Sequence, residues 1–396
     1  MGSFHTADYL VFTLSLSLSV CVALFSAWRN RHNATTHTFL LGNHSLGVLP
    51  LTISLVVSVI SAVTILGLPA EMFAHGTQYF FNIGSGLGIL LTAVVFVPLL
   101  YPLKLTSMFE YLEMRFDSRS ARLVGSLMEI LALLLYGGTA LYAPSTAIQG
   151  VTPFPTWAIS MFLGCLVTFY TCLGGLIGVV WSDVVQAFII LFGILAVIIQ
   201  GCISVGGFKA IFDLNSQGDR LHFYNFDPDP TTRHTFWGLS AGFCFGGLAF
   251  YGASQFTFQR FSAAKTLRQA KLTVLLNIPA FYVCHVLLCF LGVIIYAYYQ
   301  QQSCDPIAGH VIKSTNQLLP LFVVDVLGYI PGAPGLFIAA LTSAALSTIS
   351  SVLNSISSLL WDDILRKRLS FLSNAQSVAV NQATGSTLNP PIVTTS

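Results

Sequence analysis

Hydroxyl and amide side chains line one face of an apolar stretch, residues 335–361, that is long enough to cross a bilayer. The polar positions on this face are Ser343, Ser347, Ser350, Ser351, Asn354 and Ser358. At about 100° per residue they fall within roughly a third of a helix circumference. Polar groups in hydrocarbon must find partners inside the protein. Because Ser347 and Thr348 lie near mid-depth, where hydroxyl oxygens could replace the hydration shell of a small cation, the pattern predicts an ion-translocation helix. The alternative is that these small residues only let helices pack closely.

A second apolar stretch, residues 48–73, carries hydroxyls at three- and four-residue spacing, namely Ser54, Ser58, Ser61 and Thr64. A Gly-Leu-Pro step beyond them could let the helix unwind and release backbone carbonyls, which is tolerated where they line a cavity or ligand site. Carbonyls freed near Val57 and Ile60, opposite Ser347 and Thr348, would form an all-oxygen cage suited to a hard alkali cation. The alternative is close packing, with the hydroxyls bonded to their own helix backbone.

Two carboxylates and one basic segment stand out among the apolar runs. Asp183 lies inside such a run, where a carboxylate is expensive and by default functional, so we expect it either to attract an exiting cation or to pair with an internal Arg. Glu129 has no motif around it, and is expected to snorkel or to pair with Arg122. The basic amphipathic segment 259–271 is expected to anchor the chain at anionic headgroups.

The composition indicates an all-α polytopic membrane protein. Of 396 residues 55% are hydrophobic and 8% are charged, whereas soluble domains carry roughly 25% charged residues. The sequence contains no P-loop, dinucleotide turn, metalloprotease motif or Ser/His/Asp constellation in a polar loop, which argues against an enzyme. The basic residues are scattered among short loops, so nucleic acid is not an expected partner, and no cofactor is expected.

About nine apolar runs are long enough to span the membrane: 8–28, 48–73, 79–103, 121–148, 155–175, 177–205, 235–257, 272–299 and 334–361. An extracellular amino terminus and a cytoplasmic carboxyl terminus place most Lys and Arg residues in the cytoplasm. We expect a transmembrane domain over 1–369 and a disordered cytoplasmic tail over 370–396. Cys202 and Cys304 lie nearer the outer side and are the disulfide candidates, while the other cysteines read as small hydrophobes.

Short motifs follow one another in order between residues 8 and 366. They are Ser61-Ala62-Val63-Thr64-Ile65-Leu66-Gly67, Glu110-Tyr111-Leu112 with Arg115-Phe116, Leu141-Tyr142-Ala143-Pro144, Gly174-Gly175-Leu176 with Trp181-Ser182-Asp183 and Gln186, Arg233-His234-Thr235-Phe236-Trp237, Gln259-Arg260, Cys304-Asp305-Pro306 and Leu346-Ser347-Thr348. In this order the chain resembles the sodium:solute symporter family, and within it the branch of sodium-coupled monocarboxylate, sodium-dependent multivitamin and sodium-iodide cotransporters.

The resemblance implies an inverted-repeat (LeuT-like) sodium symporter fold with two five-helix repeats after one extra helix. Stretch 48–73 corresponds to the first core helix and 334–361 to the eighth. The implied sodium ligands are the carbonyls of Val57, Ile60 and Ala344 and the hydroxyls of Ser347 and Thr348. The implied substrate contacts are Ser61, Thr64, Tyr142, Phe250 and Tyr251. Asp183 matches the family's acidic residue on the inner sodium path.

Two departures from the family pattern matter. Ser254 stands where Asn or Asp is usual, which would weaken a local hydrogen-bond network, and the chain stops after the eighth core helix. We therefore hold two functional hypotheses. The first is sodium-coupled symport of a small organic anion or vitamin across the plasma membrane by alternating access. The second is a truncated non-transporting isoform or incomplete gene model that acts at most as an interaction or dominant-negative subunit. Expected partners are sodium, the substrate and lipid, and an oligomer is left open.

Overall fold

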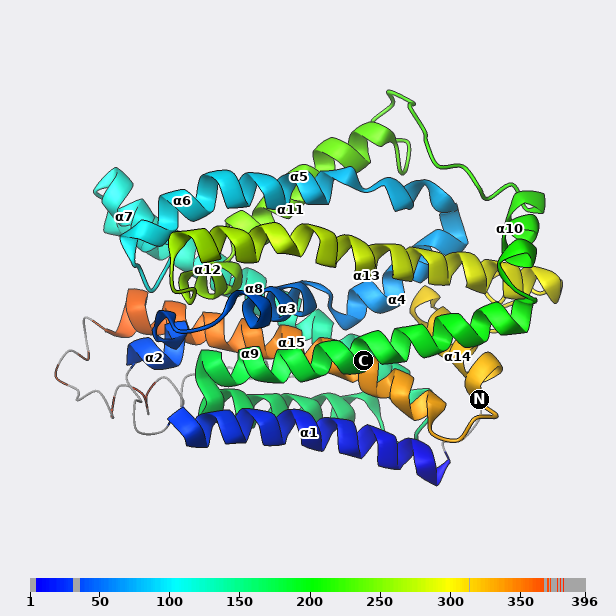
Figure 1. Ribbon diagram of the computed structural model, residues 1–396, viewed down its shortest axis with the longest axis horizontal. Coiled ribbons are helices and arrows are strands. Elements are labelled where there is room, and N and C mark those ends of the chain that lie inside the picture. The colour runs from blue at the N-terminus through cyan, green and yellow to red at the C-terminus, as the bar shows by residue number, and fades with distance from the viewer. Residues whose placement is uncertain are drawn as a thin grey trace.

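A computed structural model describes residues 5–30, 36–312 and 314–366, together with 369, 371, 376, 378 and 380. The predicted tail, 370–396, lies almost wholly outside the described residues. The helices are α1 Thr6–Asn30, α2 Thr36–Leu41, α3 Val48–Val59, α4 Ala62–His75, α5 Ile83–Leu91, α6 Val97–Leu100, α7 Glu110–Phe116, α8 Arg119–Gln149, α9 Thr156–Val205, α10 Phe208–Gln217, α11 Phe243–Gly252, α12 Gln255–Ser262, α13 Leu267–Gln301, α14 Leu318–Leu327 and α15 Ala333–Leu359. Figure 1 shows the long helices running side by side as one bundle.

The membrane-spanning character expected from composition is confirmed. Within the described ranges, 6 helices are long and apolar enough to cross a membrane, and a seventh span is the bent pair formed by α3 and α4. The six are Thr6–Arg29, Thr77–Leu103, Arg119–Gln149, Thr156–Val205, Leu267–Gln301 and Ala333–Leu365. The protein is therefore an all-α multi-pass membrane protein.

Two of the predicted spans, 155–175 and 177–205, are joined in the 50-residue helix α9. The helix is broken inside by Gly175, whose φ of 54° and ψ of −161° are not helical. A Cβ at this position would lie 2.7 Å from the Phe39 ring and 2.8 Å from the Phe39 carbonyl oxygen. Both the positive φ and the close approach of Phe39 require glycine here, so the two predicted spans meet at a real discontinuity.

The predicted span 235–257 is also broken. Its apolar helical part covers Gly238–Gly252, and after Ala253 and Ser254 the chain begins the separate helix α12. The break lets the chain change direction, so that α12 places Arg260 in the protein interior. A continuous membrane span would not allow this.

Helices α3 and α4 meet at an angle of 60°. Ile60, with φ −83° and ψ 84°, and the extended Ser61 form the break. The expectation that the Gly67-Leu68-Pro69 step unwinds the helix is wrong, because Pro69 lies inside α4. In a continuous helix the Ser61 amide would donate to Val57, but here it donates to the Val59 carbonyl at 3.1 Å. The break thus changes the hydrogen bonding of the carbonyls near Val57.

Helix α15 lies at the centre of the bundle, where it contacts α9, α8, α1 and α3. Figure 1 shows α9 crossing it, with α1 on one side and α13 on the other. Its many Ser and Ala residues are small and allow this close approach. The polar stripe of α15 is therefore enclosed by protein, and Ser347, Ser351 and Ser358 find partners outside the helix.

Asp8 joins α1 to the start of α15. Its carboxylate is buried and accepts hydrogen bonds from the backbone amides of Gly332 and Gly335, both at 3.0 Å. These amides belong to the first turn of α15, whose N–H groups have no partner within the helix.

We expect Asp8→Ala to lower the free energy of unfolding by about 1–2 kcal/mol, because it removes an N-cap acceptor and leaves buried amides unpaired. The unfolding temperature of detergent-purified protein measures this loss. Asp8→Asn keeps an acceptor oxygen and serves as the control, with a smaller drop. An unfolding temperature equal to that of the wild type for Asp8→Ala would contradict this role.

Candidate functional site

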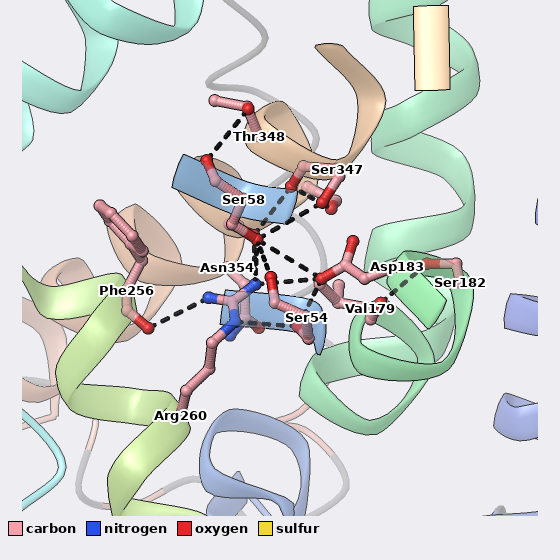
Figure 2. A network of polar contacts seen from close by, with 12 residues as sticks. Ser54, Ser58, Val179, Ser182, Asp183, Phe256, Arg260, Ser347, Thr348 and Asn354 are labelled. Carbon is pink, nitrogen blue, oxygen red and sulfur yellow. Dashed lines mark hydrogen bonds and ion pairs between the residues drawn. The ribbon is translucent and has the colours of Figure 1, made fainter. Parts of the chain in front are cut away.

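A buried polar network links α3, α9 and α12 (Figure 2). Its charged members are Asp183 and Arg260, with side chains 0% and 1% exposed. The Arg260 Nη2 lies 3.1 Å from the Asp183 Oδ2, and Ser54 of α3 donates to the same Oδ2 at 2.5 Å. Of the two expectations for Asp183, the internal pair with an Arg is the arrangement in this structure.

The guanidinium of Arg260 is surrounded by acceptors. Its Nε donates to Ser54 Oγ at 2.9 Å, its Nη2 to Ser58 Oγ at 2.6 Å, and its Nη1 to the Phe256 carbonyl at 3.1 Å. Ser351 of α15 also accepts from Nη2. A charge taken out of water is tolerated only with this kind of pairing and hydrogen bonding.

The expectation that segment 259–271 as a whole anchors the chain at headgroups is therefore wrong for Arg260. Lys265 and Arg268 are exposed, but Arg260 lies in the core. The chain breaks at Ser254, and the helix that follows, α12, packs against α15, α13 and α3. This packing places Arg260 in the core. Sequence analysis missed Arg260 as a site residue, and its neighbours Phe258 and Phe261 are also fully buried in the structure.

The five implied sodium ligands, Val57, Ile60, Ala344, Ser347 and Thr348, are all buried. The structure brings the break after α3 against the middle of α15. At this contact Thr348 Oγ1 donates to the Ser58 carbonyl oxygen at 3.1 Å, and Ser58 Oγ lies 2.8 Å from Ser351 Oγ and 3.4 Å from Ser347 Oγ. Thr348 Oγ1 also lies 3.0 Å from the Ala344 carbonyl oxygen.

The junction brings together oxygen atoms of a kind that can coordinate an alkali cation. The atoms that converge are neutral hydroxyl and carbonyl oxygens, which suit hard cations. Among the described residues, no group of three or more His, Cys, Asp or Glu side chains could hold a metal ion. Sequence analysis missed Ser58, whose carbonyl and hydroxyl both face α15.

A cavity of about 750 Å³ adjoins this junction. Ile60 lines it, as do four of the implied substrate residues: Ser61, Thr64, Phe250 and Tyr251. Much of the remaining wall is aromatic or apolar, which is typical of small-molecule sites. The junction between α3 and α15 and the cavity therefore share one wall, at the break between α3 and α4.

Tyr142 is not part of this cavity, and its assignment as a substrate contact is wrong for this structure. Its side chain is 59% exposed on α8. Tyr136, six residues earlier on the same helix, lines the cavity instead. Six residues correspond to a rotation of about 240°, so the two tyrosines cannot share a face.

Glu129 of α8 does not pair with Arg122. Its Oε1 accepts from Ser254 Oγ at 2.9 Å and from the Gln255 amide at 3.1 Å, and so holds the start of α12. Arg122 is bound by Asp362, Asp363 and Glu113. Although Ser254 stands where the family usually has Asn or Asp, its hydroxyl donates to Glu129, so a hydrogen bond is retained at this position.

The disulfide candidates Cys202 and Cys304 are both free thiols.

Comparisons with known proteins agree with this architecture. A family model described as "sodium:solute symporter family" matches residues 39–379. The sodium-dependent multivitamin transporter of Oryctolagus cuniculus is 39% identical over 383 residues, covering 96% of this chain and 60% of the relative. The sodium-coupled monocarboxylate transporter 2 of Homo sapiens is 36% identical over 381 residues, with coverages of 96% and 61%. The chain thus spans about three-fifths of the length of these relatives.

Two solved structures share the fold. A Na+-coupled sialic acid symporter, in a substrate-bound outward-open state with a novel Na+ site, matches with a TM-score of 0.88 and 28% identity. That match covers 98% of this chain and 81% of the solved one. A nucleobase-cation-symport-1 transporter in a closed conformation has a TM-score of 0.55 at 13% identity and supports the fold alone. The expected inverted-repeat (LeuT-like) helical fold is confirmed.

Proposed function

This chain belongs to the sodium:solute symporter family, and we propose that it carries a small organic anion or vitamin across the plasma membrane together with sodium. The observation that supports this proposal best is the shared wall between the oxygen-rich junction and the cavity. Ile60 lines the cavity and follows Ser58, whose carbonyl Thr348 contacts, by two residues. Two ligands bound on opposite sides of one helix break would each sense the position of that break, which is what coupling requires.

For sodium we propose the carbonyl oxygens of Val57, Ile60 and Ala344 and the hydroxyls of Ser347 and Thr348. All five ligands are neutral. Neutral oxygens can bind a monovalent cation and still release it during transport, because they carry no negative charge that would hold it tightly. The Thr348 hydroxyl can donate to the Ala344 carbonyl, 3.0 Å away, while its lone pairs face the cation. Sodium in this position would fix α15 against the break and so favour one arrangement of the bundle.

For the substrate we propose the cavity residues Ser61, Thr64, Phe250 and Tyr251, with Tyr136 in place of Tyr142. Two hydroxyls and an aromatic wall suit a small molecule with one polar end and a short apolar body. The relatives named above are monocarboxylate and multivitamin transporters, which supports a carboxylate as the polar end.

For the release of sodium we propose a path past Asp183. Its Oδ1 is buried and has no hydrogen-bond partner among the described residues, whereas its Oδ2 is bound by Arg260 and Ser54. A cation leaving the junction could contact Oδ1 without breaking the ion pair. In the proposed orientation the amino terminus is extracellular and the carboxyl terminus cytoplasmic, as the distribution of Lys and Arg favours.

Uptake by proteoliposomes that contain the full chain tests this proposal. Labelled butyrate, biotin and iodide are offered as probes with external sodium, and again with choline in its place. We expect uptake of at least one probe that depends on sodium. Background uptake of all three, with correctly inserted protein, would favour the rival hypothesis of a non-transporting subunit. That rival also predicts that co-expression lowers the uptake of a full-length relative.

A further inference from the structure

The motif Arg233-His234 has no role in the site described so far. Both residues line the cavity, together with Glu71 of α4. Glu71 follows Ser61 by ten residues, which corresponds to about 15 Å along a helix. The three side chains therefore mark the end of the cavity remote from the ion site, and this end is called the mouth below.

All contacts at the mouth converge on one carboxylate oxygen. Arg233 Nε and Nη2 lie 2.6 and 2.5 Å from Glu71 Oε1, and His234 Nε2 lies 3.0 Å from the same atom. His75 Nε2 is more distant, at 3.9 Å. Because Glu71 Oε1 has donors from both Arg233 and His234, it remains hydrogen-bonded if one of these side chains moves away.

The donors differ in their freedom to move. Arg233 is 60% exposed, whereas Glu71 is 25% and His234 is 11% exposed. His234 is further fixed by a left-handed backbone, with φ 55°, and by edge contact with the Tyr79 ring. An exposed ion pair contributes little net stability, so Arg233 can leave Glu71 at small cost while His234 keeps the carboxylate paired.

We propose that Arg233 forms an outer binding site for the carboxylate of the substrate, in exchange for Glu71. This inference rests on the proposed function. Arg233 is the only Lys or Arg among the described residues that line the cavity, and its planar fork matches a carboxylate with two parallel hydrogen bonds. Glu71 competes for the same fork, so it keeps the site weak enough to pass the anion inward.

If Arg233 binds the substrate in exchange for Glu71, substitutions of these two residues should change the half-saturating butyrate concentration in opposite directions. With labelled butyrate and saturating sodium, Arg233→Gln should raise the half-saturating butyrate concentration about tenfold, since a charge-assisted hydrogen bond to the substrate is lost. Glu71→Gln should lower it about threefold, because the competitor loses its charge. If the ion pair were only structural, both substitutions would change the half-saturating butyrate concentration in the same direction. Arg233→Lys should lie between wild type and Arg233→Gln.

Arg220 provides the matched control at the same end of the bundle. Its Nη1 donates to the Ala74 carbonyl at 2.8 Å, and its guanidinium lies over the Tyr296 ring, but it does not line the cavity. Arg220→Gln should leave the half-saturating butyrate concentration unchanged. Arg233→Gln should keep the unfolding temperature of the wild type, which excludes a folding defect.

A binding measurement separates this inference from the proposed function. We expect millimolar butyrate, without sodium, to raise the unfolding temperature of detergent-purified wild type but not of Arg233→Gln. If the wild type shows this rise but no sodium-driven uptake of butyrate, butyrate symport is wrong while the outer site stands. If the wild type shows no rise, or if both substitutions shift the half-saturating concentration in the same direction, the outer site is overturned.

Discussion

Arg260→Met is expected to lower the free energy of unfolding by about 3–5 kcal/mol, because it leaves the Asp183 carboxylate buried without a counter-charge. Asp183 would keep only its hydroxyl donor Ser54, at 2.5 Å, and the more distant Ser58, at 3.5 Å. Neither supplies a positive charge. The loss is measured as a fall in the unfolding temperature of detergent-purified protein, and we expect low yields of the variant.

The double variant Arg260→Met with Asp183→Asn is the control, since it removes both charges. If the loss comes from an unpaired carboxylate, the double variant should recover most of it, because replacing a whole buried ion pair is often nearly neutral. A double variant as unstable as Arg260→Met alone would show that packing of the guanidinium, and not its charge, determines the effect.

Thr348→Ala should raise the sodium concentration needed for half-maximal uptake about tenfold, because the proposed ion site loses one of its two hydroxyl ligands. Thr348→Ser keeps the hydroxyl and should stay close to the wild type. The measurement is initial uptake as a function of external sodium, with substrate held at saturation.

Ser355→Ala is the matched control for Thr348→Ala on the same helix. Ser355 is also buried, but it lies about two turns further on and donates to Gln259 Oε1 at 3.1 Å. It should leave the sodium dependence unchanged. Equal effects of the two substitutions would mean that α15 responds to any lost hydroxyl, and would count against the ion-site assignment.

The meeting of the two hydroxyl-bearing helix faces could be predicted from the sequence because helix periodicity is regular. The hydroxyl face of residues 335–361 and that of 48–73 both lie inside the bundle, and they meet at Ser58 and Thr348 as the pattern requires. Gly175 was likewise visible as a discontinuity, since a Gly-Gly pair marks a place where the backbone can leave the helical conformation.

Other features depend on tertiary contacts that the local sequence does not reveal. The break at Ile60 contains neither Gly nor Pro, and the contacts of its neighbouring carbonyls lie on α15. Pro69, the apparent breaker, is accommodated within α4. Tyr142 is implied by a family motif, which does not show which face of α8 points to the cavity. Arg260 looked like a headgroup anchor because nothing in its own segment shows that Asp183, far away in sequence, faces it.

If sodium and substrate move together, a sodium gradient alone should drive butyrate into proteoliposomes. Proteoliposomes containing the chain are loaded with labelled butyrate at the external concentration, and an inward sodium gradient is then imposed. We expect internal labelled butyrate to rise above the external concentration, and a sodium ionophore to abolish the rise. An internal concentration that stays equal to the external one, whatever the sodium gradient, would show that the two are not coupled.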